Sequence, residues 1–407
     1  MSGGAGTSVH MNLARRLQPI KPSQTLAQNA KVKALTAKGV EVLSLVAGEP
    51  DFDTPEHIKQ AAISALAAGF TKYTQTPGIP ELRAAICEKL RRDNDLEYTP
   101  EQVLVSNGAK HSVYNFCQAV LNDGDEVIIF APYWVSYPDM ALLAGGKPVI
   151  IDTDARNGFL PDPDRVKRAL SSRTKAIVIN SPCNPTGAVL PRETLLEIAR
   201  AVRDQNCLIL TDDIYEKLLF RSEPFVNILN VMPELRSRTV VVNGMSKAFA
   251  MTGWRIGYAA GPQEIISAMN LVQDQATSSP SSLGQKAALA ALKGPKESTD
   301  RMVAEFRARR DIIVNGLNAI DGFECHMPDG AFYVFPRVQK LLERKYKARR
   351  LTGSIQLADV LLDDFRIAVV AGLPFGTEGH VRMSFATSRQ TIEQALMRLK
   401  EFAASFN

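Results

Sequence analysis

The chain has 407 residues, of which 45% are hydrophobic and 22% charged, and its formal net charge at pH 7 is +5. This length and composition are typical of a globular enzyme with two domains, or with one large domain and a smaller attachment. The charge is mild, no basic block is interleaved with aromatic residues, and no apolar run could span a bilayer, so we expect neither nucleic acid nor a membrane as partner.

The first residues and the cysteines bear on the compartment. The opening MSGGAGTSVH lacks the basic and apolar regions of a secretory signal, so we expect residues 1–11 to form a flexible tail. The five cysteines are scattered and form no CxxC pair, which favours a reducing, cytoplasmic location without disulfides or a zinc ribbon. The five histidines have no metal-ligand spacing, so we expect no metal site.

Short β-rich runs alternate with helical stretches between residues 101 and 261. The expected strands are VLVS (103–106), EVIIF (126–130), PVIID (148–152), KAIVIN (175–180), CLILT (207–211), TVVVN (239–243) and RIGYAAG (255–261). Amphipathic segments such as 111–121 and 192–205 lie between several of them. This alternation predicts an α/β fold with a mostly parallel seven-stranded sheet flanked by helices. The last two strands are close enough in sequence to form an antiparallel pair.

The chain changes character near residue 296. A long charged helix (301–318) precedes FECHMPDGAFYVFP (323–336), the β-rich pieces RIAVVAG (366–372) and GHVRMSFAT (379–387), and a closing helix (390–404). This order predicts a second, smaller α+β domain. We therefore expect residues 51–295 to form a large domain, and residues 12–50 and 296–407 to form a small one.

Polar residues collect directly after the expected strands. The segments NGAK (107–110), APYW (131–134), SPCNPTG (181–187), DDIYE (212–216) and GMSK (244–247) each follow one. In an open α/β sheet, ligands bind at the edge where the carboxyl ends of the strands meet. Five such loops predict one site at that edge. The glycine turn before a helix at Ala109 would offer free backbone N–H groups to an anion there.

Each of these features has a plainer interpretation. Asn107–Gly108 and 184–187 could be simple turns, Asp212 could cap a helix formed by IYEKLLF with Tyr215 in the core, Lys247 could be a surface lysine, and Arg255 could be a structural ion-pair partner. All of these would have to coincide at one edge, which favours a site. The motifs GxGxxG, GxxxxGK[ST], GxSxG and HExxH are absent, which argues against dehydrogenases, nucleotide hydrolases, α/β-hydrolases and metallohydrolases.

The residue types at this edge suit pyridoxal 5′-phosphate (PLP). A lysine with a lowered pKa can bond an aldehyde, and PLP is an aldehyde that also needs an anion site and a carboxylate to keep its ring nitrogen protonated. Lys247 can supply the amine and Asp212 the carboxylate. Arg255 and the helix start at Gly108, Ala109 and Lys110 can hold the phosphate, Asn184 and Tyr215 can bond the ring hydroxyl, and Trp134 can stack on the ring.

The sequence here resembles a known family. The stretch GMSKAFAMTGWRIG (244–257) is similar to the PLP-lysine signature of class I aminotransferases. The segments VAGEPDFDTP (46–55), KYTQTPGIPELR (72–83), SPCNPTGAV (181–189), DDIYE (212–216) and VRMSFATS (381–388) agree with that family. The resemblance runs from about Asn12 to the C-terminus and is greatest for bacterial aspartate aminotransferases with a KPSQTLA-type segment (21–27). It implies the type I fold of PLP-dependent enzymes and a homodimer with active sites at the subunit interface.

The resemblance also implies a role for each matching residue. Lys247 would bond the cofactor and move the substrate proton, with Asp212 at the ring nitrogen, Tyr215 and Asn184 at the ring oxygen, and Trp134 on the ring face. Gly108, Ala109, Lys110, Ser246 and Arg255 would contact the cofactor, as would Tyr73 of the partner subunit. Arg382 would bind the substrate α-carboxylate beside Gly48. Lys110, helped by Thr25, would bind a second carboxylate, although Lys110 could also be a surface lysine at a helix start.

Three departures from the family pattern and several alternatives stay open. Gly244 stands where many members have a serine, Cys183 where Asn or Ser is common, and AGLPFG (371–376) where PGxxFG is usual. The resemblance implies ping-pong transamination between an amino acid, first of all aspartate, and a 2-oxo acid, first of all 2-oxoglutarate. The alternatives are a prephenate or aromatic aminotransferase and a PLP-dependent C–S β-lyase. A ligand-sensing regulator is disfavoured, because no helix-turn-helix pattern precedes Gly48.

Overall fold

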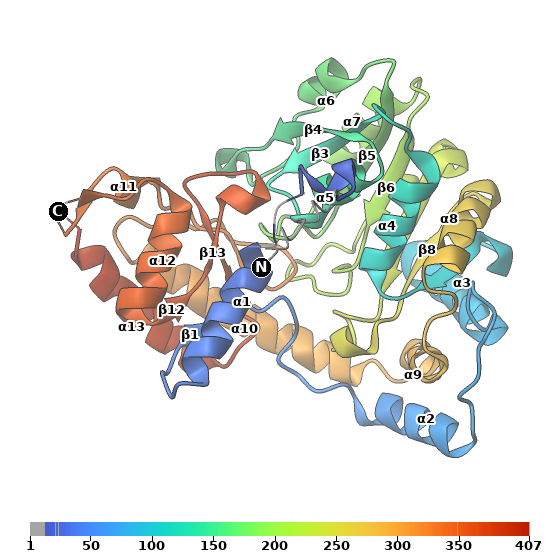
Figure 1. Ribbon diagram of the computed structural model, residues 1–407, viewed down its shortest axis with the longest axis horizontal. Helices are drawn as coiled ribbons and strands as arrows, with labels where there is room; N and C mark the ends of the chain where they lie inside the picture. Colours follow the sequence, from blue (N-terminus) through green and yellow to red (C-terminus); the bar gives the residue numbers. More distant parts are fainter. Residues whose placement is uncertain (1–12, 21, 23, 348, 407) are drawn as a thin grey trace, which may run out of the picture.

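The computed structural model describes residues 13–20, 22, 24–347 and 349–406. In Figure 1 the large sheet and its helices occupy the right half of the molecule, and the C-terminal elements occupy the left half. The long helix α10 (Glu297–Asn318) runs between the two halves. The tail expected at residues 1–11 lies outside the described residues. The predicted division into a large and a small domain stays a prediction.

The large sheet has seven strands in the order β2-β8-β7-β6-β5-β3-β4. Their bounds are β2 (Val103–Ser106), β3 (Glu126–Ala131), β4 (Lys147–Asp152), β5 (Thr174–Asn180), β6 (Leu208–Asp212), β7 (Thr239–Gly244) and β8 (Gly257–Ala260). Neighbouring strands are parallel except around β8, which is antiparallel to both β2 and β7. The predicted mostly parallel seven-stranded sheet is therefore confirmed, and so is the antiparallel pair β7–β8.

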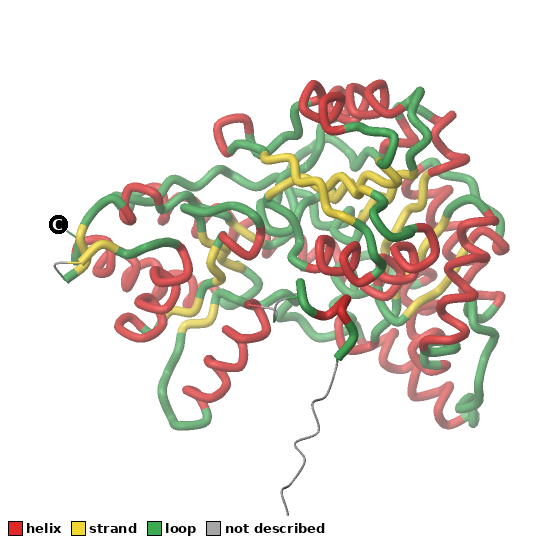
Figure 2. Tube along the Cα trace, turned by 45° about the horizontal axis from the view of Figure 1, so that its top comes forward, coloured by secondary structure: helices red, strands yellow, loops and turns green. Residues whose placement is uncertain are grey.

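Helices cover both faces of this sheet. In Figure 2 the helices, in red, lie on either side of the strands, in yellow. These helices are α3 (Pro80–Asn94), α4 (Ala109–Val120), α5 (Ser136–Leu143), α6 (Pro163–Ala169), α7 (Arg192–Val202), α8 (Gln263–Ala276) and α9 (Ser282–Lys293). Helix α2 (Glu56–Ala67) packs on α9. The apolar strands explain this arrangement, because alternate residues point to opposite faces. In β3, Ile128 packs in one core with helices α3, α7 and α9, while Val127 and Ile129 pack in another with α4, α5 and α8.

The periodicity of the helices matches these cores. In α7 the buried residues include Leu195, Ile198, Ala199 and Val202, which lie on one face because an α-helix repeats every 3.6 residues. The solvent side of the same helix carries Glu193 and Arg200. Helix α7 therefore has one apolar face against the sheet and one charged face toward water.

The C-terminal elements form a second core. Their bounds are β9 (Tyr333–Val334), α11 (Gln339–Leu342), β10 (Lys345–Tyr346), β11 (Arg349–Arg350), α12 (Ser354–Phe365), β12 (Ile367–Ala368), β13 (Val370–Ala371), β14 (Val381–Ser384) and α13 (Arg389–Ala404). Strands β13, β14 and β9 form a three-stranded antiparallel sheet. The N-terminal region, with α1 (Gln24–Thr36) and β1 (Leu43–Ser44), joins this part of the molecule, because β1 pairs in parallel with β12.

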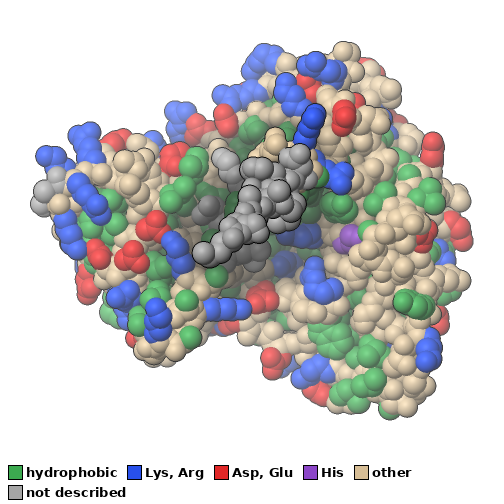
Figure 3. Space-filling model, in the orientation of Figure 1, with side chains coloured by type: hydrophobic (Ala, Val, Ile, Leu, Met, Phe, Trp, Pro, Cys, Tyr) green, Lys and Arg blue, Asp and Glu red, His purple; other side chains and the backbone are tan. Residues whose placement is uncertain are grey.

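Short 3-10 helices complete the described elements. They lie at Arg15–Leu17, Pro100–Gln102, Ala155–Asn157, Ile228–Asn230, Pro233–Arg238, Thr252–Trp254 and Leu373–Phe375. In the described part of the chain, no helix is both long and apolar enough to cross a membrane. The loops after β2, β3, β5, β6 and β7 meet at one edge of the large sheet, which faces the C-terminal elements. Figure 3 shows a hollow between the two halves with basic side chains at its border.

Candidate active site

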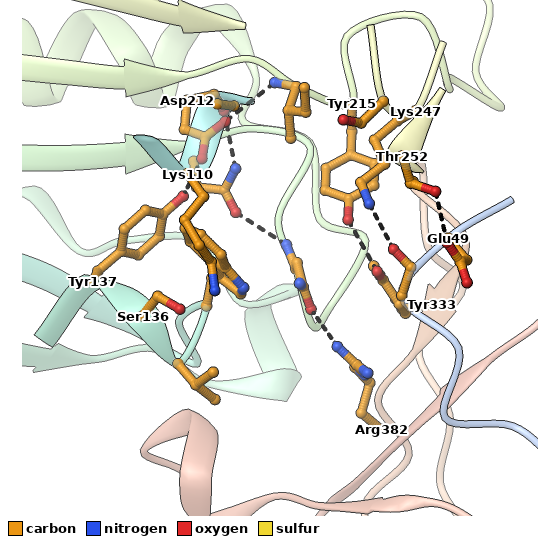
Figure 4. A pocket seen from close by; sticks show the side chains of 18 of the residues that line it. Glu49, Lys110, Ser136, Tyr137, Asp212, Tyr215, Lys247, Thr252, Tyr333 and Arg382 are labelled. Carbon is orange, nitrogen blue, oxygen red and sulfur yellow. Dashed lines mark hydrogen bonds between the residues drawn. The ribbon is translucent and has the colours of Figure 1, made fainter. Parts of the chain in front are cut away.

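A cavity of about 370 Å³ lies at this edge of the sheet (Figure 4). The predicted site residues that line it are Gly48, Ala109, Lys110, Trp134, Asn184, Asp212, Tyr215, Ser246, Lys247, Arg255 and Arg382. Gly108 lies directly behind Ala109 as the N-cap of α4. Two predicted residues are not placed here: Tyr73 is 93% exposed on a loop, and the side chain of Thr25 lies outside the described residues. One cavity thus collects residues from six separate loops.

Lys247 follows β7 and projects into this cavity. Its Nζ donates a hydrogen bond of 2.6 Å to the backbone oxygen of Gly48. Burial lowers the pKa of Lys247 to about 8, against the opposing effect of Glu49 and together with the effect of Arg255 and Arg382. About a tenth of this amine is therefore unprotonated at pH 7, far more than for an ordinary lysine, and the unprotonated amine is the form that acts as a nucleophile. Lys247 lines the cavity rather than the outer surface.

Glycines let the loops at this edge approach one another. A Cβ atom on Gly257 would lie 2.2 Å from the backbone nitrogen of Ala109, and one on Gly108 would lie 2.4 Å from Nη2 of Arg255. Gly108 also has a φ of +87°, which disfavours any side chain. At Gly244, where many members of the resembled family have a serine, a Cβ would lie 2.9 Å from the Cα of Gly257. Glycine at this position therefore belongs to the close contact between β7 and β8.

Arg255 lies beside the start of α4, an arrangement that suits an anion. The guanidinium donates hydrogen bonds to the backbone oxygens of Thr252 (2.8 Å) and Asn107 (3.2 Å), which hold it beside the N-terminus of α4. Arg255 itself has a φ of +56°, so the backbone is turned to bring the side chain here. The first N–H groups of a helix have no partner within the helix and attract anions. A phosphate would find both a cation and these N–H groups.

Asp212 is the last residue of β6 and is 4% exposed. Its Oδ2 accepts a hydrogen bond of 2.6 Å from the Tyr137 hydroxyl, and its Oδ1 accepts one of 3.3 Å from the Ile214 nitrogen. Burial raises the pKa of Asp212, while these hydrogen bonds and Lys247 oppose the rise. Residues 214–217 form a turn, so the alternative that Asp212 caps a helix is wrong. A buried carboxylate of this kind gains stability from a bound cation.

Two tyrosines form the wall next to Lys247. The hydroxyls of Tyr215 and Tyr333 lie 2.9 Å apart, and both side chains are buried. Burial raises the pKa of both phenols, so both stay neutral and keep a proton to donate. The ring of Tyr215 also packs edge-on against Phe332, at 5.5 Å between centroids. Tyr215 therefore packs in the core and also lines the cavity.

Arg382 on β14 is a buried cation, 2% exposed. Its Nη1 donates to Oδ1 of Asn184 and its Nη2 to the Val46 oxygen, each at 3.0 Å. Its Nε is buried without a partner, and no acidic side chain among the described residues forms an ion pair with it. The rings of Tyr333 and Phe375 pack at 4.5 and 5.1 Å from the guanidinium carbon. Such a group has room for a planar carboxylate.

Lys110, the second residue of α4, lies on the other side of the cavity from Arg382 in Figure 4. Its Nζ lies 5.0 Å from the centre of the Trp134 ring. The Trp134 ring in turn packs edge-on against Tyr137, at 5.1 Å. Lys110 is exposed on one side, but its amine reaches the cavity, which is the placement that the interpretation as a second-carboxylate ligand requires.

Sequence reasoning missed several residues of this cavity. Tyr137, Tyr333, Glu49 and Thr252 line it, and none stood out from the sequence. Thr252 donates a 2.6 Å hydrogen bond to Oε2 of Glu49 across 203 positions of sequence. The position of Tyr137 three residues after Trp134, at the start of α5, was the one available signal. The others depend on contacts between distant segments.

The groups of this cavity fit PLP. An amine of lowered pKa, a buried carboxylate, a helix N-terminus with an arginine and an aromatic side chain are the partners that its aldehyde, ring nitrogen, phosphate and ring need. The glycine cradle at the phosphate end would be filled by any added Cβ. The unpartnered Nε of Arg382 leaves a place for a substrate carboxylate.

Comparisons with known proteins agree with this assignment. The family model described as aminotransferase class I and II matches residues 40–399. An aspartate/prephenate aminotransferase from Nitrosomonas europaea is 48% identical and covers 96% of this chain and 99% of its own length. The crystal structure of the aspartate aminotransferase from Rhizobium meliloti superposes with a TM-score of 0.94 at 42% identity, covering 98% of this chain and 100% of that one.

A further solved structure carries a ligand in its description. This is the aspartate aminotransferase from Thermus thermophilus with maleate, with a TM-score of 0.89 and 46% identity over 96% of this chain and 99% of that one. The family match spans most of the chain, and the relatives match it nearly end to end. The chain therefore belongs to the class I and II aminotransferases, enzymes of the type I α/β fold that depend on pyridoxal 5′-phosphate.

Proposed function

We propose that this aminotransferase moves the amino group between aspartate and a 2-oxo acid such as 2-oxoglutarate. The observation that carries the proposal is that two cations, Arg382 and Lys110, line the same cavity as Lys247 (Figure 4). Two separate cations suit a substrate with two carboxylates. The relatives named aspartate aminotransferase, and the one described with maleate, a dicarboxylate, support this choice.

Prephenate is the second candidate substrate. The Nitrosomonas relative is named for both aspartate and prephenate, and prephenate also carries two carboxylates. The same pair, Arg382 and Lys110, would serve both substrates. A C–S β-lyase would not need a second cation, so the placement of Lys110 favours transamination.

The cofactor would be held, in this proposal, by groups from five loops. Lys247 would bond its aldehyde, Asp212 would pair with the ring nitrogen, Asn184 and Tyr215 would donate to the ring oxygen, and Trp134 would cover the ring. Gly108, Ala109, Lys110, Ser246 and Arg255 surround the phosphate. When bound, PLP supplies an electron sink for the negative charge that is left when the substrate loses its Cα proton.

The protein's own groups do the rest of the chemistry. Arg382 grips the α-carboxylate and, with the Gly48 backbone nearby, fixes which face of the substrate meets Lys247. Once the substrate amine has replaced it on the cofactor, the free Lys247 amine, with a pKa of about 8, would accept the Cα proton and later donate it to form the product. Asp212 stays anionic opposite a cation, and the neutral phenol of Tyr215 donates a hydrogen bond to a developing negative charge.

The active enzyme is proposed to be a cytoplasmic homodimer that shares its active sites. Tyr73, between α2 and α3, is 93% exposed, and Ile63 and Leu66 on α2 are 55% and 56% exposed. Exposed apolar residues on one element favour a surface that another chain covers. Tyr73 of the partner subunit would then reach the phosphate. The described cysteines are all free thiols, which supports a reducing compartment.

A half-reaction screen tests the substrate assignment. The purified holoenzyme is mixed with one amino acid at a time, without an acceptor, and loss of the visible absorption band of the bound cofactor is followed. Aspartate and glutamate should react fastest. Fast alanine or aromatic turnover with slow aspartate turnover would contradict the assignment. Release of pyruvate and ammonia from a cysteine-like substrate without any 2-oxo acid would instead show a lyase.

A further inference from the structure

The segment 46–54 contacts Arg382, Lys247 and residues that follow Lys247 in sequence. Its contacts are Val46 oxygen with Arg382 (3.0 Å), Gly48 oxygen with Lys247 (2.6 Å), Glu49 with Thr252 (2.6 Å), and the Thr54 hydroxyl with both the Ala250 oxygen (2.7 Å) and the Trp254 ring nitrogen (2.9 Å). The stretch 247–254, called the lysine loop below, is therefore fastened to this segment at several points. On the side of segment 46–54, all of these contacts except that of Glu49 use a backbone oxygen or an uncharged side chain.

Glu49 is the charged residue that segment 46–54 contributes to these contacts. In Figure 4 its carboxylate points at Thr252, beside Lys247. Among the described residues, the carboxylates that line the cavity are those of Asp212 and Glu49. Asp212 lies at the sheet and is held by Tyr137. Neither cofactor binding nor substrate binding, as proposed above, uses Glu49.

We propose that Glu49 is a positioning residue for Lys247, because it fastens the lysine loop through Thr252 and places a negative charge at the lysine end of the cavity. This inference rests on the proposed role of Lys247. It assigns to one side chain two separable effects, a hydrogen bond and a charge.

The charge acts on the protonation of Lys247. The charged groups that face the amine are Glu49 and Asp212, which favour its protonated form, and Arg255 and Arg382, which disfavour it. Glu49 raises the pKa of Lys247, whereas burial and the two arginines lower it. Removal of the Glu49 charge must therefore lower the pKa of Lys247. The amine then loses its proton at a lower pH than in the unchanged protein.

Substitutions separate the two effects. Glu49→Gln keeps an oxygen that can accept from Thr252 and removes the charge. Thr252→Val removes the hydrogen bond and keeps the charge. Glu49→Ala removes both. Asp53→Asn is the matched control, because Asp53 is an exposed carboxylate of the same neighbourhood that does not line the cavity.

The first measurement uses the full chain freed of cofactor. A neutral amine-reactive reagent modifies Lys247, and the rate is followed by peptide mass spectrometry across a pH range centred on the pKa of about 8. We expect the midpoint to move to lower pH by about half a unit in Glu49→Gln and Glu49→Ala, the size typical of one carboxylate at a partly solvated site. Thr252→Val and Asp53→Asn should keep the midpoint of the unchanged protein.

The plateau of the same curves reports on positioning. At high pH all variants have an unprotonated amine, so a change in rate reflects access and orientation of Lys247. Thr252→Val and Glu49→Ala should change this plateau severalfold, while Glu49→Gln should change it less. A midpoint in Glu49→Gln equal to that of the unchanged protein, or an equal shift in Asp53→Asn, overturns the charge effect. An unchanged plateau in Thr252→Val and Glu49→Ala overturns the positioning effect.

The visible absorption band of the holoenzyme separates this inference from the function on which it rests. If Lys247→Ala leaves the band of the purified, cofactor-loaded protein unchanged, then Lys247 does not bond the cofactor and the proposed function fails. If the band depends on Lys247 but the midpoint of amine modification in the cofactor-free chain is the same with and without the Glu49 charge, only the role of Glu49 fails.

Discussion

The hydrogen bond from Tyr137 to Asp212 controls the buried carboxylate at the sheet edge. It is short, 2.6 Å, and lies between two buried side chains. Hydrogen bonds to a charged acceptor of this kind contribute about 1.5–3 kcal/mol. The Tyr137 ring also packs against Trp134, so the hydroxyl and the ring have separate roles.

The substitution Tyr137→Phe keeps the ring and removes the hydroxyl. Because the lost hydrogen bond had lowered the pKa of Asp212, that pKa rises further, and the carboxylate becomes protonated at a higher pH than before. We expect cofactor affinity to fall about tenfold or more. The acid limb of the kcat/KM profile should move to higher pH. Equilibrium dialysis and a pH profile check this, with Tyr133→Phe as control, since Tyr133 does not line the cavity.

The two cations of the cavity are expected to differ in their effect on substrates. Lys110→Met should lower kcat/KM for aspartate by about 10- to 100-fold, because one charge-assisted contact to the second carboxylate is lost. The same variant should change kcat/KM for alanine by less than about threefold, since alanine has no second carboxylate. Arg382→Lys should lower both, because the planar fork that binds the α-carboxylate is lost. Equal losses for both amino acids in Lys110→Met would contradict the assignment.

Residues of the site were predictable from the sequence where they follow a strand directly. Asp212 and Lys247 come after apolar runs, so their place at the sheet edge followed from the strand positions. Tyr333 was not predictable, because its contact with Tyr215 joins residues 118 positions apart. The contact of Glu49 with Thr252 joins residues 203 positions apart and is likewise set by the assembled fold alone.

At the scale of elements, the junction of β7, β8 and α4 determines the phosphate end of the cavity. Gly257, the first residue of β8, packs directly on the start of α4. This close approach lets Arg255 reach the N-terminus of α4. The two cations of the lysine signature, Lys247 and Arg255, thus lie at the ends of a short excursion between neighbouring antiparallel strands.

The substitution Gly257→Ala should disturb this junction. The added Cβ would lie 2.2 Å from the Ala109 nitrogen, so α4 or β8 must shift. We expect the free energy of unfolding to fall by about 1–3 kcal/mol, and cofactor affinity to fall as well, because the helix N-terminus moves from Arg255. Urea unfolding with and without cofactor measures both. Gly253→Ala is the control, because nothing lies within 4 Å of its Cβ, and a similar loss there would contradict this account.

Element predictions succeeded where the apolar pattern was long. The seven strands of the large sheet each carry an apolar run, and α10 and α13 were expected close to their observed bounds. The short strands β9, β12 and β13 have two residues each, too few for periodicity to define them. The hairpin of β10 and β11 consists of charged residues and one tyrosine, so no apolar pattern marks it. Strands β9 and β12 form by pairing with the distant strands β14 and β1, whereas β10 and β11 pair with each other.

At the scale of the whole molecule, the proposal that two chains share their active sites can be tested by combining two different variants in one dimer. Lys247 and Asp212 line the same cavity of one chain, whereas Tyr73 is 93% exposed on the loop between α2 and α3. If Tyr73 serves the site of the partner, then defects at Tyr73 and at Lys247 lie in different active sites of a mixed dimer. One of its two sites would then combine an intact Lys247 with an intact Tyr73 from the other chain.

Mixing Tyr73→Ala with Lys247→Ala chains tests this. Random exchange of subunits should restore native composition to roughly a quarter of all sites, so activity should rise above the mean of the two separate variants. The negative control is Lys247→Ala mixed with Asp212→Ala, since both residues come from the same chain and no native site can form. Light scattering should show a dimer throughout. A monomer, or a Tyr73 mixture no more active than its components, would show that each chain builds its site alone.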